Sequence, residues 1–284
     1  MFSDTHFHFK MMTQERGVDG VEVLSQLAQR NCFFGLDIGT RAGDLQGRQL
    51  AVEKCIAGIA DAQLADKARS FMYFSVGIWP DVESIKDREN QVKLLRESIT
   101  PGSIIAVGEC GLDHHWNPSG EDGRSEEDFD EQVYRGEREL FEAQIQLARD
   151  LKLPVIVHSR DAFQDTLECI NNIGYHNGII HCYSYGIDEA RAFLDLGWYI
   201  ALGGGITYTK KSKLEQMQEL IRFIPSDRLL TETDAPYLAP VPFRGQANSP
   251  VLVEHVFNYI AQTRGITVDE LNATVDSNIK SLFF

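Results

Sequence analysis

The chain of 284 residues lacks features that define several large classes of protein. It contains no run of about 18 apolar residues, which excludes a hydrophobic transmembrane helix. Its first residues contain no basic segment leading into an apolar stretch, so we expect no signal peptide. Only five cysteines are present and none forms a C-x-x-C pair, which favours free thiols in a reducing cytoplasm.

Positive charge is also scarce. Lysine and arginine total 27 against 42 aspartates and glutamates, which gives a formal net charge of −15 at pH 7. A protein that coats long duplex DNA neutralises many phosphates with basic side chains, so this composition disfavours that role. The charge does not exclude a nuclease that recruits a single phosphate through metal ions.

The chain does contain a regular alternation of short apolar runs and amphipathic stretches. The apolar runs predict strands over 2–9, 31–39, 71–80, 104–113, 154–160, 178–184, 198–204 and 229–236. Helices are expected over 20–30, 49–69, 91–99, 137–151, 162–173, 189–196 and 213–224, with a closing pair over 251–263 and 267–284. The longest irregular segment, 114–135, follows the fourth strand, where an enzyme would place a lid or a substrate loop.

Sustained alternation of this kind is typical of an α/β protein with parallel strands and crossover helices. Eight units favour a closed (β/α)8 TIM barrel, although the pattern alone leaves open a doubly wound sheet of eight strands. We therefore predict a single barrel domain spanning residues 1–284.

Two histidines stand two positions apart on the first expected strand. Side chains repeat every two residues along a strand, so His6 and His8 point to the same side, which in a small barrel can be the interior. Asp4 shares that parity, and we expect it to hold one imidazole from behind. Taken alone, the pair is weak evidence for a metal site, because a buried, hydrogen-bonded histidine gives the same pattern.

Four further polar residues stand at the ends of other strands. Glu109 lies near the end of the fourth expected strand and His158 ends the fifth. His181 ends the sixth and Asp234 the eighth. Active sites of (β/α)8 barrels form at this end of the strands, and a charged group after an apolar run is costly to bury unless it is paired or coordinated. The pattern predicts one shared metal site.

The six candidate ligands indicate two ions rather than one. Four imidazoles and two carboxylates exceed what one four-coordinate ion needs, and Glu109 is the expected bridge between two divalent ions. The candidates are Mg²⁺, Mn²⁺ and Zn²⁺, with the imidazoles favouring Zn²⁺ or Mn²⁺ over Mg²⁺. Such ions polarise a phosphoryl or carbonyl oxygen and activate a water. Asp234 is expected to accept the proton of that water, so Glu109 and Asp234 are the candidate catalytic residues.

At these residues the chain resembles the TatD family of metal-dependent hydrolases, relatives of the amidohydrolases. The family's D-x-H-x-H, G-E-x-G-L-D and P-V-x-x-H-x-R-D-A blocks are similar to residues 4–8, 108–113 and 154–162. Its H-C-[FY]-S-G, L-x-E-T-D-A-P-[YF]-L and R-G…N-x-P blocks are similar to 181–184, 230–238 and 244–250. The blocks occur in the family's order over almost the whole chain.

The resemblance implies a fold, a ligand scheme and an activity. The fold is a (β/α)8 barrel and the activity is phosphodiester hydrolysis, of the 3′-to-5′ exonuclease type on DNA. One ion is implied at His6, His8 and Asp234, the other at His158 and His181, and Glu109 is shared. Members of this family carry V-G-x-H-P-H after the third strand, whereas residues 76–81 read V-G-I-W-P-D, a departure that bears on the substrate.

Other residues near the expected mouth are candidates for substrate binding. Arg160 and Arg244 are suited to hold a phosphate bidentately. Asp113 is expected either to orient a ligand or to contact the substrate. Of the adjacent His114 and His115, we expect one near the pocket and one solvated.

We therefore expect a cytoplasmic phosphodiesterase that acts on single-stranded DNA ends, with no membrane association and no obligate protein partner. A second hypothesis is hydrolysis of an amide, ester or lactone, but enzymes of that kind often bridge their ions through a carboxylated lysine on the fourth strand, and 104–113 contains no lysine. A third hypothesis is a barrel that has lost catalysis and serves as a binding protein. It predicts eroded ligands, whereas all six positions are filled.

Overall fold

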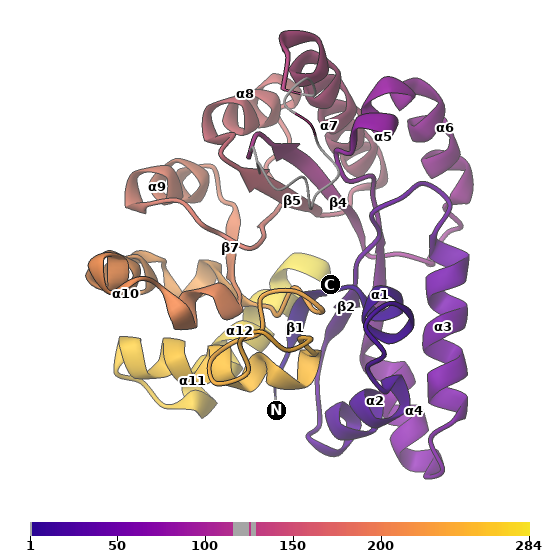
Figure 1. The fold of residues 1–284 in the computed structure, drawn as a ribbon, viewed down its shortest axis with the longest axis vertical. Coiled ribbons are helices and arrows are strands. Elements are labelled where there is room, and N and C mark those ends of the chain that lie inside the picture. Colours follow the sequence, from indigo (N-terminus) through magenta and orange to yellow (C-terminus); the bar gives the residue numbers. More distant parts are fainter. Residues whose placement is uncertain (1, 116–124, 126–128) are drawn as a thin grey trace.

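In the computed structural model, which describes residues 2–115, 125 and 129–284, eight parallel strands form one sheet whose order follows the chain (Figure 1). The strands are β1 Asp4–Phe7, β2 Gly35–Asp37, β3 Met72–Val76, β4 Ala106–Asp113, β5 Val155–Arg160, β6 Gly178–Ile180, β7 Tyr199–Leu202 and β8 Leu229–Thr231. The order β1 to β8 with every neighbour parallel is that of a (β/α)8 barrel, and it rules out the doubly wound alternative.

The first and last strands meet and nearly close the barrel. Phe7 forms a parallel bridge with Ala235, just beyond β8. The backbone N–H of Asp234 donates to the carbonyl of His6 at 2.9 Å, and that of His8 donates to Ala235 at 2.7 Å. The Thr5 hydroxyl adds a hydrogen bond to the carbonyl of Thr231 at 3.1 Å. The fold prediction is therefore confirmed.

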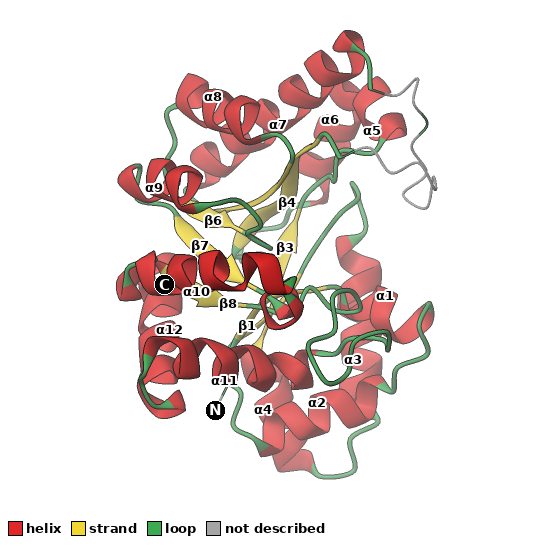
Figure 2. Cartoon of the chain, turned by 60° about the vertical axis from the view of Figure 1, so that its left-hand side comes forward, coloured by secondary structure: helices red, strands yellow, loops and turns green. Residues whose placement is uncertain are grey.

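Helices surround the strands, as Figure 2 shows. They are α1 Phe9–Gln14, α2 Gly20–Gln29, α3 Leu45–Ala57, α4 Ala62–Phe71, α5 Val82–Lys86, α6 Arg88–Ser98, α7 Glu131–Leu151, α8 Phe163–Ile173, α9 Ile187–Asp195, α10 Leu214–Phe223, α11 Val253–Arg264 and α12 Val268–Phe283. Their apolar faces pack on the strands, and the apolar first residues of β4 and β5 are fully buried for this reason. None of the described helices is long and apolar enough to span a membrane.

Helices α1 and α5 were not expected from the sequence, and two of the expected helices differ most in their bounds. The helix expected over 49–69 is two helices, because Asp61 caps α4 by accepting from the backbone N–H of Gln63 at 2.8 Å. The helix expected from residue 137 begins at Glu131, where the Asp130 side chain accepts from the N–H of Val133 at 2.8 Å. Part of the segment predicted to be irregular is thus helical, and residues 116–124 and 126–128 of it lie outside the described residues.

Candidate metal centre

Six polar side chains meet at the carboxyl ends of the barrel strands. Each belongs to a strand or lies within three residues of its end, so the strands set their positions. The six are the predicted ligands His6, His8, Glu109, His158, His181 and Asp234. All are buried or half-buried. The structure therefore brings together every candidate ligand that the sequence indicates.

The first group of ligand atoms comes from the seam between β1 and β8. Nε2 of His6 lies 3.3 Å from Oε2 of Glu109 and 3.6 Å from Oδ1 of Asp234. Nε2 of His8 lies 3.6 Å from the same Glu109 oxygen and 3.5 Å from the same Asp234 oxygen. Two imidazoles and two carboxylate oxygens thus face one point.

The second group uses the other oxygen of the same glutamate. Oε1 of Glu109 lies 3.1 Å from Nδ1 of His158 and 3.0 Å from Nε2 of His181. The two histidine nitrogens are 3.4 Å apart. Since each carboxylate oxygen of Glu109 faces a different group, this side chain has the geometry of a bridge.

These separations fit metal coordination. Two donors that each lie about 2.0–2.1 Å from a tetrahedral ion are about 3.3 Å apart. In addition, neither ring nitrogen of the buried His6 has a hydrogen bond to any described residue. A buried polar group without a partner is costly, and coordination would remove that cost. The residues therefore fit divalent ions on both sides of Glu109.

Electrostatics in the cluster also favour a bound cation. Burial opposes the charge of Glu109, but His181, His158 and His6 outweigh it and hold the pKa of this carboxyl well below its usual range. Burial likewise opposes ionisation of Asp234, yet a hydrogen bond from His8 and the charges of the neighbouring histidines lower its pKa. Both carboxylates are therefore anionic at neutral pH and attract positive charge.

A second layer of carboxylates lies behind two of the histidines. Oδ2 of Asp113 lies 2.9 Å from Nε2 of His158, which turns Nδ1 toward Glu109. Oε1 of Glu232 lies 3.6 Å from Nδ1 of His181 and accepts the N–H of Cys182 at 2.6 Å. The contact between Asp113 and His158 is the one expected for the orienting role, the first of the two roles predicted for Asp113.

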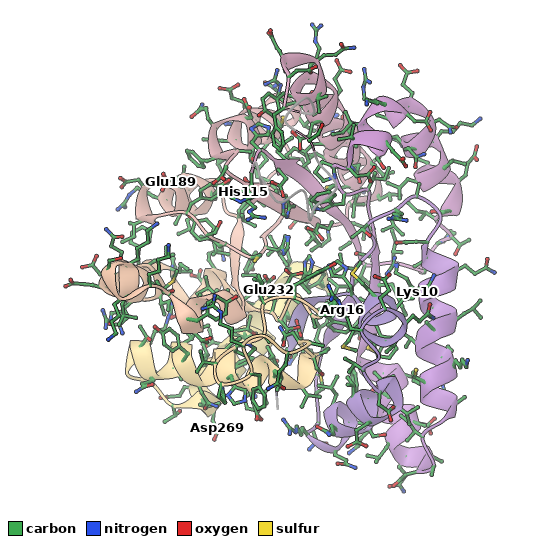
Figure 3. All side chains as sticks on the ribbon, viewed as in Figure 1. Lys10, Arg16, His115, Glu189, Glu232 and Asp269 are labelled. Atoms are coloured by element: carbon green, nitrogen blue, oxygen red, sulfur yellow. The ribbon has the colours of Figure 1, made fainter. Side chains whose placement is uncertain are left out.

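Glu232 is a residue of the site that the sequence reasoning missed. It is fully buried and lies near the centre of the barrel in Figure 3. Its spacing from Asp234 was the available signal, because residues two positions apart near the end of a strand have their side chains on the same face.

Asp4 does not support an imidazole, so that expectation is wrong. Its oxygens accept from the backbone N–H of His6 at 3.0 Å, the N–H of Thr233 at 3.1 Å and the hydroxyl of Thr233 at 2.6 Å. The Nδ1 atom of His8 instead faces the carbonyl of Ile38 at 3.4 Å. Asp4 links β1 to the segment after β8, because its carboxylate accepts hydrogen bonds from the backbone and hydroxyl of Thr233 and not from an imidazole.

The adjacent histidines after β4 are not among the grouped ligand atoms. His114 places Nε2 3.0 Å from Oε2 of Glu137 on α7, and its side chain is only 12% exposed. His115 places Nδ1 2.7 Å from Oδ2 of Asp161, and its side chain is 37% exposed. His115 is thus the more solvated of the two, and His114 packs against α7.

The candidate substrate residues lie around the mouth. Arg160 ends β5 and is exposed. The guanidinium of Arg244, in the segment after β8, lies 4.4 Å from the ring centroid of Tyr208. Trp79, which stands where the similar family carries a histidine, lies beside His158 with ring centroids 5.8 Å apart. The indole of Trp79 thus forms a wall of the site at the position where the similar family carries a histidine.

Comparison with known proteins agrees with this geometry. A family model described as TatD related DNase matches residues 3–284. The chain is 34% identical over 290 residues to the uncharacterized metal-dependent hydrolase YcfH of Escherichia coli K12, a match that covers 99% of this chain and 94% of that protein. It is 32% identical over 229 residues to the 3′-5′ ssDNA/RNA exonuclease TatD of Pantoea vagans, covering 78% of this chain and 81% of the relative. The crystal structure of YJJV, a TatD homologue from Escherichia coli K12, superposes with a TM-score of 0.78 at 27% identity, covering 99% of this chain and 97% of that one.

Proposed function

This chain belongs to the TatD-related DNase family of metal-dependent hydrolases, and we propose that it hydrolyses phosphodiester bonds at the 3′ ends of single-stranded DNA. The observation that carries this proposal is that the two carboxylate oxygens of Glu109 face different histidines. Oε2 lies nearest His6 and His8, whereas Oε1 lies nearest His158 and His181. The name of the Pantoea vagans relative supports the substrate class. The proposal assigns the activity to a single barrel domain over residues 1–284, in a cytoplasmic protein with free cysteines.

The proposed ligand scheme follows the two groups of atoms. His6, His8 and Asp234 would hold one divalent ion, His158 and His181 the other, and Glu109 both. When bound, Mg²⁺, Mn²⁺ or Zn²⁺ would polarise a phosphoryl oxygen and lower the pKa of water.

Asp234 is the proposed proton acceptor. Its side chain is 15% exposed, against 6% for Glu109, so it is the carboxylate of the pair that a water molecule can approach more easily. The pKa of Asp234 is lowered, which keeps the carboxylate ionised and able to accept a proton. Asp113 and Glu232 orient His158 and His181 and do not touch the reacting atoms in this scheme.

The free guanidinium groups support an anionic substrate. Most arginines in the described part of the chain form ion pairs or hydrogen bonds. Among the described residues, the arginines whose guanidinium group forms neither are Arg16, Arg41, Arg160, Arg191 and Arg244. All of these except Arg191 follow or end β1, β2, β5 or β8, so they surround the mouth of the barrel. Arginine there is suited to bind phosphate.

The test is degradation of a 5′-labelled single-stranded oligodeoxynucleotide with each of the three ions. We expect a ladder of products shortened from the 3′ end. The Glu109→Gln variant should lose this activity, whereas Glu254→Gln, which changes a carboxylate that pairs with Arg30 on the outside of the barrel, should keep it. Hydrolysis of lactones or amides with no release of nucleotides would overturn the proposal in favour of the amidohydrolase alternative.

A further inference from the structure

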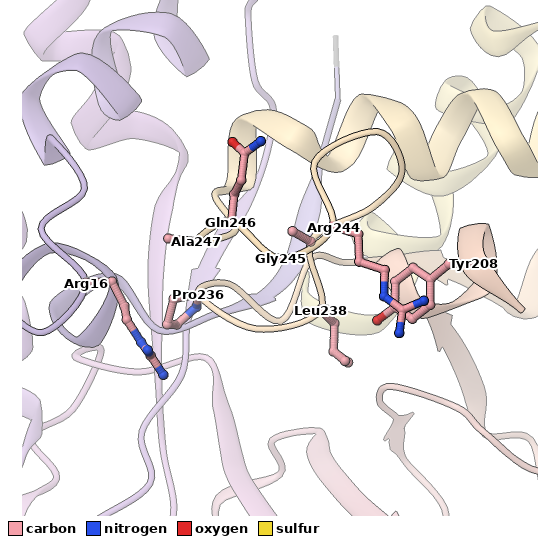
Figure 4. Close-up of a pocket in the computed structure, with 9 residues that line it drawn as sticks. Arg16, Tyr208, Pro236, Leu238, Arg244, Gly245, Gln246 and Ala247 are labelled. Atoms are coloured by element: carbon pink, nitrogen blue, oxygen red, sulfur yellow. The ribbon is translucent and has the colours of Figure 1, made fainter.

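A cavity of about 350 Å³ lies at the barrel mouth beside the metal centre. Three segments form its wall: the one after α1, the one after β7 and the long one after β8. Its lining residues are Arg16, Tyr208, Pro236, Leu238, Ala239, Arg244, Gly245, Gln246 and Ala247 (Figure 4). None of the six proposed metal ligands lines it, and its size is in the range of small-molecule sites.

The cavity is positively charged in a strongly acidic protein. Two guanidinium groups line it, and no carboxylate does, although the formal net charge of the chain is −15. Neither Arg16 nor Arg244 forms an ion pair with any residue that the structure describes. Two unpaired guanidinium groups at one cavity indicate an anionic ligand, because each can donate two hydrogen bonds to a phosphate.

The rest of the lining suits a nucleotide better than a bare anion. Tyr208 lies against the guanidinium of Arg244 and helps to hold it in place. Leu238 is 39% exposed and lines the cavity with Pro236 and Ala239, and Gln246 adds a side-chain amide to the lining. Figure 4 shows Arg16 and the Arg244–Tyr208 pair on opposite sides of the Pro236–Leu238 stretch. An apolar surface between two phosphate binders offers contacts for a base or a sugar.

The cavity wall is fastened to the metal centre. Pro236 lies two residues after Asp234, and its carbonyl accepts from the N–H of Asn248 at 3.0 Å. The side-chain amide of the buried Asn248 donates to the carbonyl of Thr233 at 2.9 Å and to that of Tyr237 at 2.6 Å. These hydrogen bonds join Asn248 to residues just before and just after Asp234. A ligand in the cavity would therefore be held at a fixed distance from the proposed metal ligands.

We propose that this cavity binds the nucleotide next to the scissile bond of a single-stranded nucleic acid, with Arg16 and Arg244 contacting its phosphates. The inference rests on the proposed function and deepens it, because it makes strand length a determinant of activity. A small diester occupies only the metal centre, whereas a strand also occupies the cavity. Loss of a phosphate contact should therefore lower kcat/KM for a strand far more than for a small diester.

The test compares Arg16→Gln and Arg244→Gln with the wild-type protein on two substrates, a six-nucleotide thymidine strand and bis(p-nitrophenyl) phosphate. We expect kcat/KM for the strand to fall about tenfold relative to that for the small diester in each variant. Arg69→Gln is the matched control, because Arg69 lies near the end of α4, just before β3 begins and thus at the opposite end of the barrel. Equal losses on both substrates, or no loss on either, would overturn the proposal.

A binding measurement separates this inference from the proposed reaction. The anisotropy of a fluorescently labelled six-nucleotide thymidine strand, recorded with no metal added, should show weaker binding by both variants than by wild-type or Arg69→Gln protein. The slope of log K against the logarithm of salt concentration should decrease in magnitude by about 0.7 for each phosphate contact that is removed. If the wild-type protein hydrolyses no diester but shows this binding pattern, the cavity assignment stands and the proposed reaction fails. If the wild-type protein binds no strand, the cavity assignment is wrong.

Discussion

The carboxylate of Glu232 accepts a hydrogen bond of 2.6 Å from the backbone N–H of Cys182, the residue that follows the proposed ligand His181. The same oxygen lies 3.6 Å from Nδ1 of His181. One buried side chain thus holds the backbone after a proposed ligand and places a carboxylate oxygen beside its ring, at a point where Cys182 adopts a positive φ of 46°. A non-glycine residue seldom adopts this conformation without support.

Replacing Glu232 should weaken metal binding without removing a ligand. We expect Glu232→Ala to lower the affinity for the ion proposed at His158 and His181 by about 10- to 100-fold, because His181 loses the carboxylate beside its Nδ1 atom. Glu232→Gln keeps an oxygen for the N–H of Cys182 and should recover part of the loss. Calorimetric titration of the metal-free proteins with Zn²⁺ and Mn²⁺ measures the effect. Identical affinities in all three proteins would show that Glu232 only packs.

Metal binding should also depend on pH through His158. Burial opposes its charge, but hydrogen bonds to Asp113 and Glu109 raise the pKa of His158 to about 9. Nδ1 must lose its proton before it can bind an ion, so affinity should increase from about pH 7 to about pH 9 and then level off. Asp113→Asn removes the carboxylate that raises this pKa and should flatten the dependence. Titrations at several pH values check both curves.

The stability of the metal-free protein should decrease over the pH range in which metal affinity increases. The pKa of His158 is about 9 in the folded protein and about 6.5 in an unfolded chain, so its protonated form stabilises the fold. This contribution is complete below about pH 6.5 and disappears as the pH rises toward 9. Urea unfolding of the metal-free protein should show a decline over that interval, and Asp113→Asn should reduce it. A decline of equal size in both proteins would assign it to other groups.

A buried ion pair beside the site should be important for stability. Nη1 of Arg48 on α3 lies 2.6 Å from Oδ2 of Asp37, which is fully buried at the end of β2. The other oxygen of Asp37 accepts from the N–H of Phe9, next to His8. Arg48→Met leaves that carboxylate without its cation and should cost about 3–5 kcal/mol in the free energy of unfolding. Urea unfolding measures the loss.

The exposed pair of Arg30 and Glu254 provides the comparison. Its side chains are 39% and 32% exposed, so Arg30→Met should cost under about 1 kcal/mol. A comparable loss in both variants would contradict the assignment of the Arg48 effect to burial.

Metal ions should stabilise the fold through the same ligands. A ligand present at 100 times its Kd stabilises the protein that binds it by about 2.7 kcal/mol. We therefore expect Zn²⁺ or Mn²⁺ to raise the midpoint of thermal unfolding by several degrees and a chelator to reverse the change. Glu109→Gln should reduce this shift more than any other single ligand substitution, since Glu109 faces both groups of atoms. An unchanged shift in that variant would contradict the bridging role.

Much of the barrel and the ligand cluster could be predicted because each rests on local patterns. Apolar runs end in His158 and His181, and parallel strands bring such ends to one face. Partners across the barrel could not be predicted in this way. Parity places the Asp4 side chain on a face, but its acceptance from Thr233 depends on how the first and last strands meet. Arg16 carries no local signal, because only the fold brings it to the same cavity as Arg244.

The contact between β1 and the segment after β8 brings together proposed ligands that are made at different stages of translation. Glu109, His158 and His181 precede residue 182, whereas Asp234 emerges about fifty residues later and reaches His6 and His8 only when the seam forms. A ribosome-bound chain that ends before β8 therefore lacks a carboxylate of the proposed first ion site. The proposed two-ion site would be complete only after nearly the whole polypeptide has been made, which would place metal binding after the contact between β1 and β8 has formed.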